Sequence, residues 1–428
     1  MLRVYRILTF FLFPLFLILI YLRVILNKED ILRYKEKIFS SSFKPNRNND
    51  RKLIWFHASS IGELLSIFPL IKEIKNSDRT INFLITTVTL SSAQLLEKRL
   101  DKYQDITHRY FPLDTKNLAE KFLDMWKPDL ACFVDSEIWP NFLFEIKKRK
   151  IPLSLINGRI TKKTFNRWKI FPFFSKQVFD NFDLCLASSE ESKSNLSELN
   201  VKNLKHIGNL KFSVKNKIEK FDAQNIKILD SFKVWCNSST HKGEELIVLK
   251  AHSEIKRIYN NVLTIIVPRH INRVNYIKNL SDKCKLNCQI LNDNETIDKD
   301  VEILIINSFG VLSKYYAYCK SIFIGKSLIK KLELVGGQNP IEAAKAGCKI
   351  FHGPYVYNFK EIYSLLNSYG FAEEVNNEKD LSRKIIQNFQ NQERVEKKQI
   401  DLLNIYGESI LKQTVVELNN LMKIDENI

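Results

Sequence analysis

Two short segments of this chain combine acidic and hydroxyl side chains in a way that suits acid–base chemistry. In the first, His57-Ala58-Ser59-Ser60-Ile61-Gly62-Glu63, an apolar strand-like run ends in a polar turn and a helix-period segment follows. A carboxylate such as Glu63 becomes a general base when it lies in a partly desolvated cleft. The same position equally suits a glutamate that only interacts with the dipole at a helix start. Both interpretations stay open from this fragment alone.

The second segment, Asp135-Ser136-Glu137, also directly follows a hydrophobic run. Two acids separated by one residue on an extended segment point to the same side, as paired catalytic carboxylates would. Alternatively, Ser136 or Asp135 caps a following helix. A lysine, Lys211, lies at a turn in Gly208-Asn209-Leu210-Lys211-Phe212. Such a lysine is usually only solvated, but in a cleft it would bind a phosphate or a carboxylate.

The second half of the chain contains residues suited to holding an anion. Arg269 follows Pro268 at the end of a strand-like run and offers a fork of donors to phosphate or carboxylate. Further on, Gly336-Gly337-Gln338-Asn339-Pro340-Ile341-Glu342 predicts a helix start, with Asn339 as cap, Pro340 first and Glu342 third. Two glycines leading into a helix start also form an anion site. Together these residues predict a nucleotide-phosphate site.

The elements that must position these residues alternate along the chain. From about Lys52, short apolar runs alternate with helix-period segments, and a second such series begins after residue 230. This alternation predicts parallel, doubly wound sheets, in which ligands bind beyond the carboxyl ends of the strands. The 428 residues suit two α/β domains. We therefore expect Rossmann-like domains at 27–212 and 231–428, joined by a linker at 213–230, with a final helix that is free to pack back on the first domain.

The amino-terminal residues 1–26 predict a membrane element. Ile7 to Leu22 are uncharged and almost wholly apolar, and basic residues flank the run on both sides. The run is shorter than the roughly 20 residues that a spanning helix prefers, and Pro14 interrupts it, so a tilted span and an interfacial helix are both open. The larger basic load after the run places the body of the protein on the cytoplasmic side.

The composition limits the classes of partner and of enzyme that suit this chain. The 66 Lys and Arg against 48 Asp and Glu give a formal charge of +18, which suits an anionic partner. Seven cysteines without a CxxC pair indicate a reduced setting. The sequence has no GxGxxG, Walker A, HExxH or GxSxG motif, which argues against the commonest nucleotide oxidoreductases, kinases, metalloproteases and hydrolases. We expect neither a metal ion nor a cofactor.

Eight segments resemble, in the same order and at comparable spacing, those of the 3-deoxy-D-manno-octulosonic acid (Kdo) transferases of lipopolysaccharide core synthesis. They are HASSIGE, SEIWPN, IPLSLINGRI, GNLKF, STHKGEE, VPRH, GGQNPIEAA and GPYVYNF. The resemblance implies a GT-B fold, with two Rossmann-like domains facing a cleft. It also implies inverting, metal-independent transfer of Kdo from CMP-Kdo to the lipid A precursor, lipid IVA. The enzyme would act at the cytoplasmic face of the inner membrane, with 27–212 as acceptor domain and 231–428 as CMP-Kdo-binding domain.

The resemblance also assigns roles to individual residues. Glu63 matches the proton acceptor, and Asp135 and Lys211 match residues that support the transition state. The matches to the CMP-binding segments are Pro268, Arg269, Phe309, Gly310, Val311, Asn339, Pro340, Ile341 and Glu342.

The chain departs from the family pattern at several places. Asp135 stands where the family more often has Glu, which shortens the reach but keeps the charge. Asn307 to Val311 replace Asp-Thr-Met-Gly-Glu, so one acidic contact is absent. Gly325-Lys326-Ser327-Leu328 replaces Gly-Gly-Ser-Leu. The last two changes lie in the nucleotide domain.

Two competing functions share part of this pattern. Another GT-B glycosyltransferase or a nucleotide-sugar epimerase would have the same fold and phosphate site, but no reason for a membrane element beside HASSIGE. A non-catalytic basic protein that binds nucleic acid or membrane would interleave basic and aromatic residues on one face. The clusters here are mixed in charge and follow strand-like runs, so no nucleic acid is expected as a partner.

Overall fold

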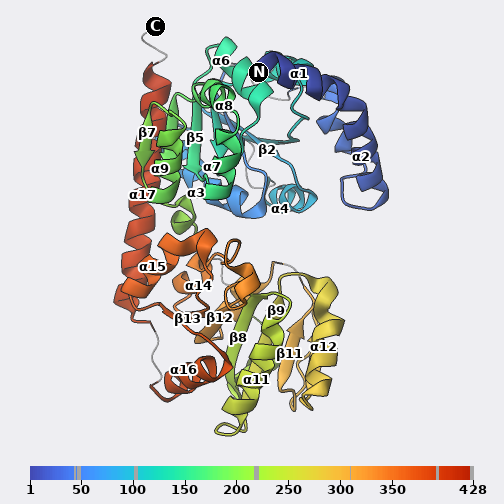
Figure 1. Ribbon diagram of the computed structural model, residues 1–428, viewed down its shortest axis with the longest axis vertical. Helices are drawn as coiled ribbons and strands as arrows, with labels where there is room; N and C mark the ends of the chain where they lie inside the picture. Colours follow the sequence, from blue (N-terminus) through green and yellow to red (C-terminus); the bar gives the residue numbers. More distant parts are fainter. Residues whose placement is uncertain are drawn as a thin grey trace. The chain divides into compact units, whose positions relative to one another are not determined.

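The computed structural model describes residues 1–42, 45, 50–100, 105–215, 221–308, 310–391 and 395–424. The chain forms two compact units, each built around one sheet (Figure 1). The first unit comprises Met1–Val214 together with the chain from Tyr406 onward, and the second comprises Lys215–Ile405. The α/β prediction with two Rossmann-like sheets is confirmed.

The sheet of the first unit has seven parallel strands in the order β3-β2-β1-β4-β5-β6-β7. Its strands are β1 (Leu53–His57), β2 (Asn82–Thr87), β3 (Ile106–Tyr110), β4 (Leu130–Val134), β5 (Leu153–Gly158), β6 (Leu184–Ala187) and β7 (Leu204–His206). Strand β1 pairs with β2 on one side and with β4 on the other. The strand order therefore reverses between β1 and β4, and in such sheets this switch point is where ligands bind.

Helices cover this sheet, so its central strands are buried along their whole length and consist mostly of apolar residues. They are α3 (Ile61–Ser77), α4 (Leu90–Leu100), α5 (Lys116–Trp126), α6 (Pro140–Lys148), α7 (Lys162–Lys169), α8 (Pro172–Phe179) and α9 (Glu190–Glu198). The core is aromatic: the Trp55 ring of β1 lies 5.0 Å from Phe122 of α5 and 5.3 Å from Phe133 of β4. This packing fixes the ends of β1 and β4, after which the two acidic segments follow.

The second unit repeats the architecture, with seven parallel strands in the order β10-β11-β9-β8-β12-β13-β14. The strands are β8 (Lys233–Thr240), β9 (Val262–Pro268), β10 (Cys288–Leu291), β11 (Ile303–Ile306), β12 (Ser321–Ile324), β13 (Lys349–His352) and β14 (Ala372–Glu374). The helices are α10 (Ala223–Asp230), α11 (Glu244–Lys256), α12 (Val274–Lys283), α13 (Leu312–Tyr316), α14 (Ile341–Lys345), α15 (Lys360–Ser368) and α16 (Glu378–Asn391). Here the strand order reverses between β8 and β12.

The chain starts with two short helices, α1 (Leu2–Phe11) and α2 (Phe13–Ile25). Within the described residues, no helix alone has both the length and the apolar character needed to cross a bilayer. Only α1 and α2 taken together meet that requirement, and they are bent by 51° at the break between them.

The last helix, α17 (Lys397–Ile424), packs its later part against the first unit. A methyl group at Gly407 would overlap the carbonyl oxygen of Phe212, so only glycine allows this approach. The Tyr406 ring lies 5.2 Å from the Phe212 ring. Helix α17 thereby supports the 3₁₀ turn Leu210–Ser213, which carries Lys211.

Candidate active site

The pairing of β1 with β4 brings the two acidic segments of the sequence together. His57, the last residue of β1, lies opposite Phe133 of β4. The chain beyond β1 continues to Glu63, and the chain beyond β4 continues to Asp135 and Glu137. All three carboxylates therefore leave the sheet beside its switch point, where ligands bind in folds of this type.

The turn after β1 holds Glu63 in a fixed orientation. Ser60 caps α3, and its hydroxyl accepts the Glu63 N–H at 3.4 Å. The Glu63 carboxylate in turn accepts hydrogen bonds from the Ser60 hydroxyl at 2.7 Å and from the Ser59 N–H at 2.8 Å. This reciprocal arrangement differs from a capping box only in that Glu63 accepts the N–H of Ser59, one residue before the cap. Glu63 therefore stabilises the helix start and is also held in place for chemistry.

The surroundings of Glu63 favour its neutral form. Burial raises the pKa of the Glu63 carboxyl, and the negative charges of Asp135 and Glu137 raise it further, while hydrogen bonds from Ser60 and Ser59 oppose them. A raised carboxyl pKa near like charges is what a general base that works near neutral pH requires.

Asp135 has an unusual backbone conformation and a buried side chain. Its backbone φ is +63°, in the left-handed region that non-glycine residues rarely occupy. The residue is 6 % exposed, and its Oδ2 accepts a hydrogen bond from Lys211 Nζ at 2.9 Å. Within the described part of the chain, its Oδ1 is buried and has no hydrogen-bond partner. Strain and an unsatisfied buried oxygen together are typical of functional sites.

The alternative that Ser136 or Asp135 caps a helix is wrong. Helix α6 begins later, at Pro140, with Trp139 at the cap position and no side-chain cap hydrogen bond from it. The Asp114 carboxylate instead accepts the Asn141 and Phe142 N–H groups at 3.1 and 3.0 Å. The helix start is thus satisfied from a different loop, and Asp135 is free for another role.

Glu137 positions the neighbouring groups. Its carboxylate accepts hydrogen bonds from Trp139 Nε1 at 2.8 Å and the Ser59 hydroxyl at 2.9 Å, and lies 3.1 Å from His57 Nε2. Burial alone would raise the Glu137 pKa, but these hydrogen bonds and the His57 ring lower it below its ordinary value. An ionised Glu137 thus fixes Ser59, which contacts Glu63.

Lys211 reaches Asp135 because its turn is anchored on both sides. The Asn157 side chain, at the end of β5, accepts the Leu210 N–H at 2.8 Å, and the Asn209 side chain accepts the Lys211 N–H at 3.0 Å. Among the three residues expected to be catalytic, the structure therefore joins Asp135 and Lys211 directly, and the charge of Asp135 acts on Glu63.

In the second unit, the expected nucleotide-binding residues follow three strands of the sheet. Pro268 ends β9 and Arg269 follows it, exposed; Gly310 and Val311 lie between β11 and α13. Phe309 lies outside the described residues. Residues 339–342 lie at the start of α14. Because parallel strands end at one edge of a sheet, all of these segments except Phe309 lie on the side where ligands bind in such folds.

The start of α14 differs in detail from the sequence prediction. The helix begins at Ile341, so Pro340 occupies the cap position and Glu342 is the second helical residue. The Asn339 side chain still accepts the Ile341 N–H, at 3.1 Å. The prediction placed the helix start one residue too early. Asn339 accepts a free N–H of the helix start from the position before the cap, and the residue pattern alone does not distinguish this position from the cap itself.

The loops near this edge are organised by a buried carboxylate, Glu244. It accepts four backbone N–H groups, those of His241, Lys326, Ser327 and Leu328, at 2.7 to 3.1 Å. Lys326 has a φ of +61°, a conformation that glycine adopts without strain. Its carbonyl oxygen accepts the Gly337 N–H at 2.6 Å. Glu244 therefore ties the loop after β12 to the glycines before α14.

We expect Glu244→Gln to destabilise the second unit by about 2–4 kcal/mol, because an amide NH₂ would face N–H donors that then lose their acceptor. Urea unfolding followed by circular dichroism measures this. The matched control is Glu254→Gln on the same helix, whose carboxylate is solvent-accessible and pairs with Arg257, and which should change stability by less than about 0.5 kcal/mol. Equal unfolding curves for the two variants would contradict the organising role.

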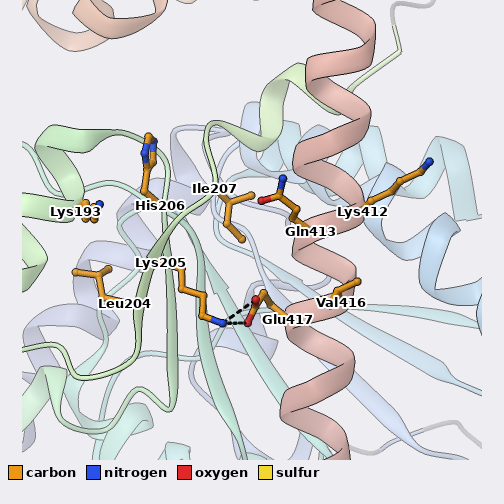
Figure 2. A pocket seen from close by; sticks show the side chains of 9 residues that line it. All are labelled: Lys193, Leu204, Lys205, His206, Ile207, Lys412, Gln413, Val416 and Glu417. Carbon is orange, nitrogen blue, oxygen red and sulfur yellow. Dashed lines mark hydrogen bonds and ion pairs between the residues drawn. The ribbon is translucent and has the colours of Figure 1, made fainter.

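The first unit also has a hollow of about 540 Å³, lined by residues of α9, β7 and α17 (Figure 2). Lys205 Nζ lies 2.7 Å from Glu417 Oε2 across it. The expected catalytic residues do not line it. The hollow marks the packing of α17 beside the edge strand β7, and the chemistry lies elsewhere on the sheet.

Comparison with known proteins identifies the family of this chain. Residues 33–214 match the family described as "3-Deoxy-D-manno-octulosonic-acid transferase (kdotransferase)". The 3-deoxy-D-manno-octulosonic acid transferase of Rickettsia bellii is 32% identical over 360 residues, which cover 83% of this chain and 82% of the relative. This chain belongs to the Kdo transferase family. A probable mitochondrial Kdo transferase of Arabidopsis thaliana is 30% identical, covering 84% of this chain and 81% of the relative.

Solved structures show that the fold of this Kdo transferase family member is of the GT-B type. A putative UDP-N-acetylglucosamine 2-epimerase from Listeria monocytogenes superposes with a TM-score of 0.60 at 13% identity, covering 86% of this chain and 95% of the other. The corresponding epimerase from Neisseria meningitidis gives a TM-score of 0.58 at 17% identity, covering 86% and 98%. The similarity to these epimerases shows the fold alone. The relatives of 30% identity or more are Kdo transferases.

Proposed function

We propose that this protein transfers Kdo from CMP-Kdo to a hydroxyl of the lipid A precursor, lipid IVA, in lipopolysaccharide core synthesis. Membership of the Kdo transferase family supports the reaction. The observation that carries the assignment of the site is the buried Glu63 beside the Asp135–Lys211 pair, at the switch point of the first sheet. The first unit would hold the acceptor, and the second unit, Lys215–Ile405, would bind CMP-Kdo.

In this mechanism Glu63 is the general base. The acceptor hydroxyl oxygen attacks the anomeric carbon of Kdo, the bond from that carbon to the CMP phosphate oxygen breaks, and the hydroxyl proton passes to Glu63. Attack on the face opposite CMP inverts the anomeric centre. The raised pKa of Glu63 and its fixed hydrogen bonds to Ser59 and Ser60 support this role.

Asp135 and Lys211 are proposed to stabilise the transition state. Positive charge develops on the sugar ring as CMP departs, and the buried carboxylate of Asp135 is suited to oppose it. Lys211 would orient that carboxylate through its 2.9 Å hydrogen bond and bring a cation close to the anionic donor. The unsatisfied Oδ1 of Asp135 supports a ligand contact at this point.

In the second unit, Arg269 and the backbone at 339–342 are proposed to hold the CMP phosphate, with Glu342 on the ribose. Pro268, Phe309, Gly310 and Val311 would complete the nucleotide pocket. Arginine at a strand end and N–H groups at a helix start are the donors that phosphate prefers.

The expected location is the cytoplasmic face of the inner membrane, with residues 1–26 attached to the bilayer. The apolar pair α1 and α2 and the basic residues around it support this location. A membrane-attached enzyme meets a lipid acceptor without having to extract it into water.

The test is CMP release from CMP-Kdo in the presence of lipid IVA, with UDP-sugars as competing donors and mass spectrometry of the lipid product. We expect Kdo-modified lipid from CMP-Kdo alone, undiminished by EDTA. Within the described part of the chain, no three His, Cys, Asp or Glu side chains are arranged to hold a metal ion. Loss of activity with EDTA and its recovery on adding a divalent ion would overturn the proposed mechanism.

A further inference from the structure

Three strand ends of the second unit bring basic side chains together. Strand β8 pairs with β9 on one side and with β12 on the other (Figure 1). His241 follows β8, Arg269 and His270 follow β9, and Lys326 follows β12. Parallel strands end at the same edge of a sheet, so these four residues, here called the basic cluster, leave the sheet beside its switch point. His241 and Lys326 are half-buried, and the other two are exposed.

Backbone hydrogen bonds hold the members of the basic cluster next to one another. The N–H groups of His241 and Lys326 are both donated to the same atom, Glu244 Oε2, at 2.9 and 2.7 Å. The Arg269 N–H is donated to the carbonyl oxygen of Thr240 at 3.2 Å. Because Thr240 directly precedes His241, the residues after the three strands converge on one place.

The two glutamates at the start of α11 already have hydrogen-bond donors. Each carboxylate oxygen of Glu244 accepts two backbone N–H groups. Glu245 pairs through both of its oxygens with Arg273, at 2.5 and 3.1 Å. Donors other than the side chains of the basic cluster therefore engage both negative charges. A cluster of cationic side chains in this setting suits an anionic ligand.

A buried hydroxyl at the same place lacks a partner. Thr240 is 0% exposed, and its Oγ1 has no hydrogen-bond partner among the residues that the structure describes. Thr240 also lies against the loop after β12, because a methyl group added at Gly325 would come within 2.7 Å of the Thr240 Cα. A buried polar atom without a partner in the protein is a place where a ligand or a water supplies one.

The His241 ring is oriented by its own loop. Its Nδ1 lies 3.0 Å from the carbonyl oxygen of Ser239. A carbonyl oxygen only accepts, so Nδ1 carries a hydrogen, and Nε2 of the neutral ring carries a lone pair. Burial lowers the pKa of His241 and the charges of Lys326 and His270 lower it further, while the bond to Ser239 and the Glu245 charge oppose them. A carboxylate beside Nε2 would favour the protonated ring, which donates from both nitrogens.

We propose that His241 and Lys326 bind the carboxylate of the sugar acid in the donor, beside the phosphate assigned above to Arg269. Kdo is an ulosonic acid, so in CMP-Kdo the carboxylate and the phosphate oxygen are attached to the same anomeric carbon. The two anionic groups therefore need adjacent donors, which the ends of β8, β9 and β12 provide. An uncharged sugar would gain nothing from the charge of Lys326, so this subsite selects sugar acids. The inference deepens the proposed function and rests on it.

The test compares calorimetric binding of two ligands to the full chain: CMP-Kdo, and CMP methyl ester, a phosphodiester without the carboxylate. Lys326→Met should weaken CMP-Kdo binding about tenfold to a hundredfold, because a charge-assisted hydrogen bond is lost. It should leave methyl ester binding within about threefold of the parent, which also shows that the variant is folded. Lys326→Arg keeps the charge and should retain most of the affinity. Lys250→Met, at an exposed position of α11, is the control and should bind both ligands like the parent.

Two outcomes would overturn the subsite. Equal weakening of both ligands by Lys326→Met would place the lysine on the phosphate or in the fold. Unchanged binding of both ligands would show that Lys326 contacts neither anionic group.

His241 has a separate readout in proton uptake. Calorimetry near pH 7 in HEPES and in Tris, which differ in ionisation enthalpy, measures the protons bound with each ligand. The parent should take up protons with CMP-Kdo and fewer with the methyl ester. His241→Gln should lose the difference, because an amide donates without protonation, whereas His270→Gln should keep it. Loss of the difference in His270→Gln alone, or its absence in the parent, would overturn the role of His241.

Failure of the subsite and failure of the proposed function give different results. If the parent bound neither ligand, both would fail. If the parent bound both and Lys326→Met did not discriminate between them, the subsite alone would fail. If binding of CMP-Kdo depended on Lys326 but no Kdo reached lipid IVA, the proposed reaction would fail and the subsite would stand.

Discussion

Glu63→Gln should lower turnover of CMP-Kdo by about 10²- to 10⁴-fold while leaving CMP-Kdo affinity and melting temperature nearly unchanged. The amide keeps the size of the carboxylate; its oxygen can accept the Ser59 N–H and its NH₂ can donate to the Ser60 hydroxyl, so the side chain stays at the start of α3. It cannot accept the proton of the acceptor hydroxyl. Steady-state turnover and calorimetric CMP-Kdo binding on one preparation measure both quantities.

The matched control is Glu73→Gln, a half-buried glutamate farther along the same helix. It should turn over like the parent protein, because it lies outside the cluster. If the folded Glu63→Gln protein also kept near-normal turnover, Glu63 would be a capping residue only. The role of base would then pass to Asp135 or Glu137, to be tested by the corresponding Asn and Gln variants.

If Glu63 is the base, its raised pKa also predicts how turnover depends on pH. Turnover needs the ionised base, so it should rise with pH through the raised pKa of Glu63. Because the Asp135 charge contributes to that rise, Asp135→Asn should move the acid limb of the pH–rate profile to lower pH, whatever it does to the maximum rate. An acid limb that stays in place would show that another group limits turnover.

As the pH rises, the contribution of Glu63 to the free energy of unfolding changes in the opposite direction to turnover. A folded-state pKa above the ordinary 4.5 means that the folded protein binds the Glu63 proton more tightly than the unfolded chain. The stability this contributes is therefore lost as pH rises from 4.5 through the raised pKa. Glu63→Gln removes this loss, so its free energy of unfolding relative to the parent should increase over that window. The ionised base is thus maintained at some expense to the fold.

The sequence predicted the sheets well because their signal is local. Alternating apolar runs and helix-period segments identify parallel strands and their helices without any knowledge of the partners. It could not predict strand order, which depends on contacts between distant residues. That β1 lies between β2 and β4 is the one fact that turns two separate acidic segments into a single cluster.

The residue pattern also did not predict which groups position the residues of the site. Asp135 and Asp114 are both aspartates that follow short apolar stretches, yet only the Asp114 carboxylate accepts N–H groups at the start of α6, from a loop 27 residues before Asn141. Asn157 and Gly407 position the Lys211 turn from a strand end and from the last helix. Nothing in their own neighbourhood in the sequence indicates this, because each acts through a long-range contact.

The second large effect is expected at the Asp135–Lys211 pair. Lys211→Met removes the only hydrogen-bond partner that Asp135 Oδ2 has among the described residues, and Oδ1 has none there. A carboxylate 6 % exposed would then lie unpaired, which typically costs about 3–5 kcal/mol. Turnover should fall at least about 10²-fold, because the transition state loses a charged group and its partner loses its orientation.

A double-mutant cycle separates these two consequences. Asp135→Asn with Lys211→Met leaves no unpaired charge at this pair, so most of the lost stability should return, while turnover should stay at least about 10²-fold below the parent. Urea unfolding and steady-state turnover of the two single variants and the double variant close the cycle. Recovery of turnover together with stability would mean that the pair only supports the fold. Recovery of stability alone would mean that the charged pair serves the reaction and that the fold does not depend on it.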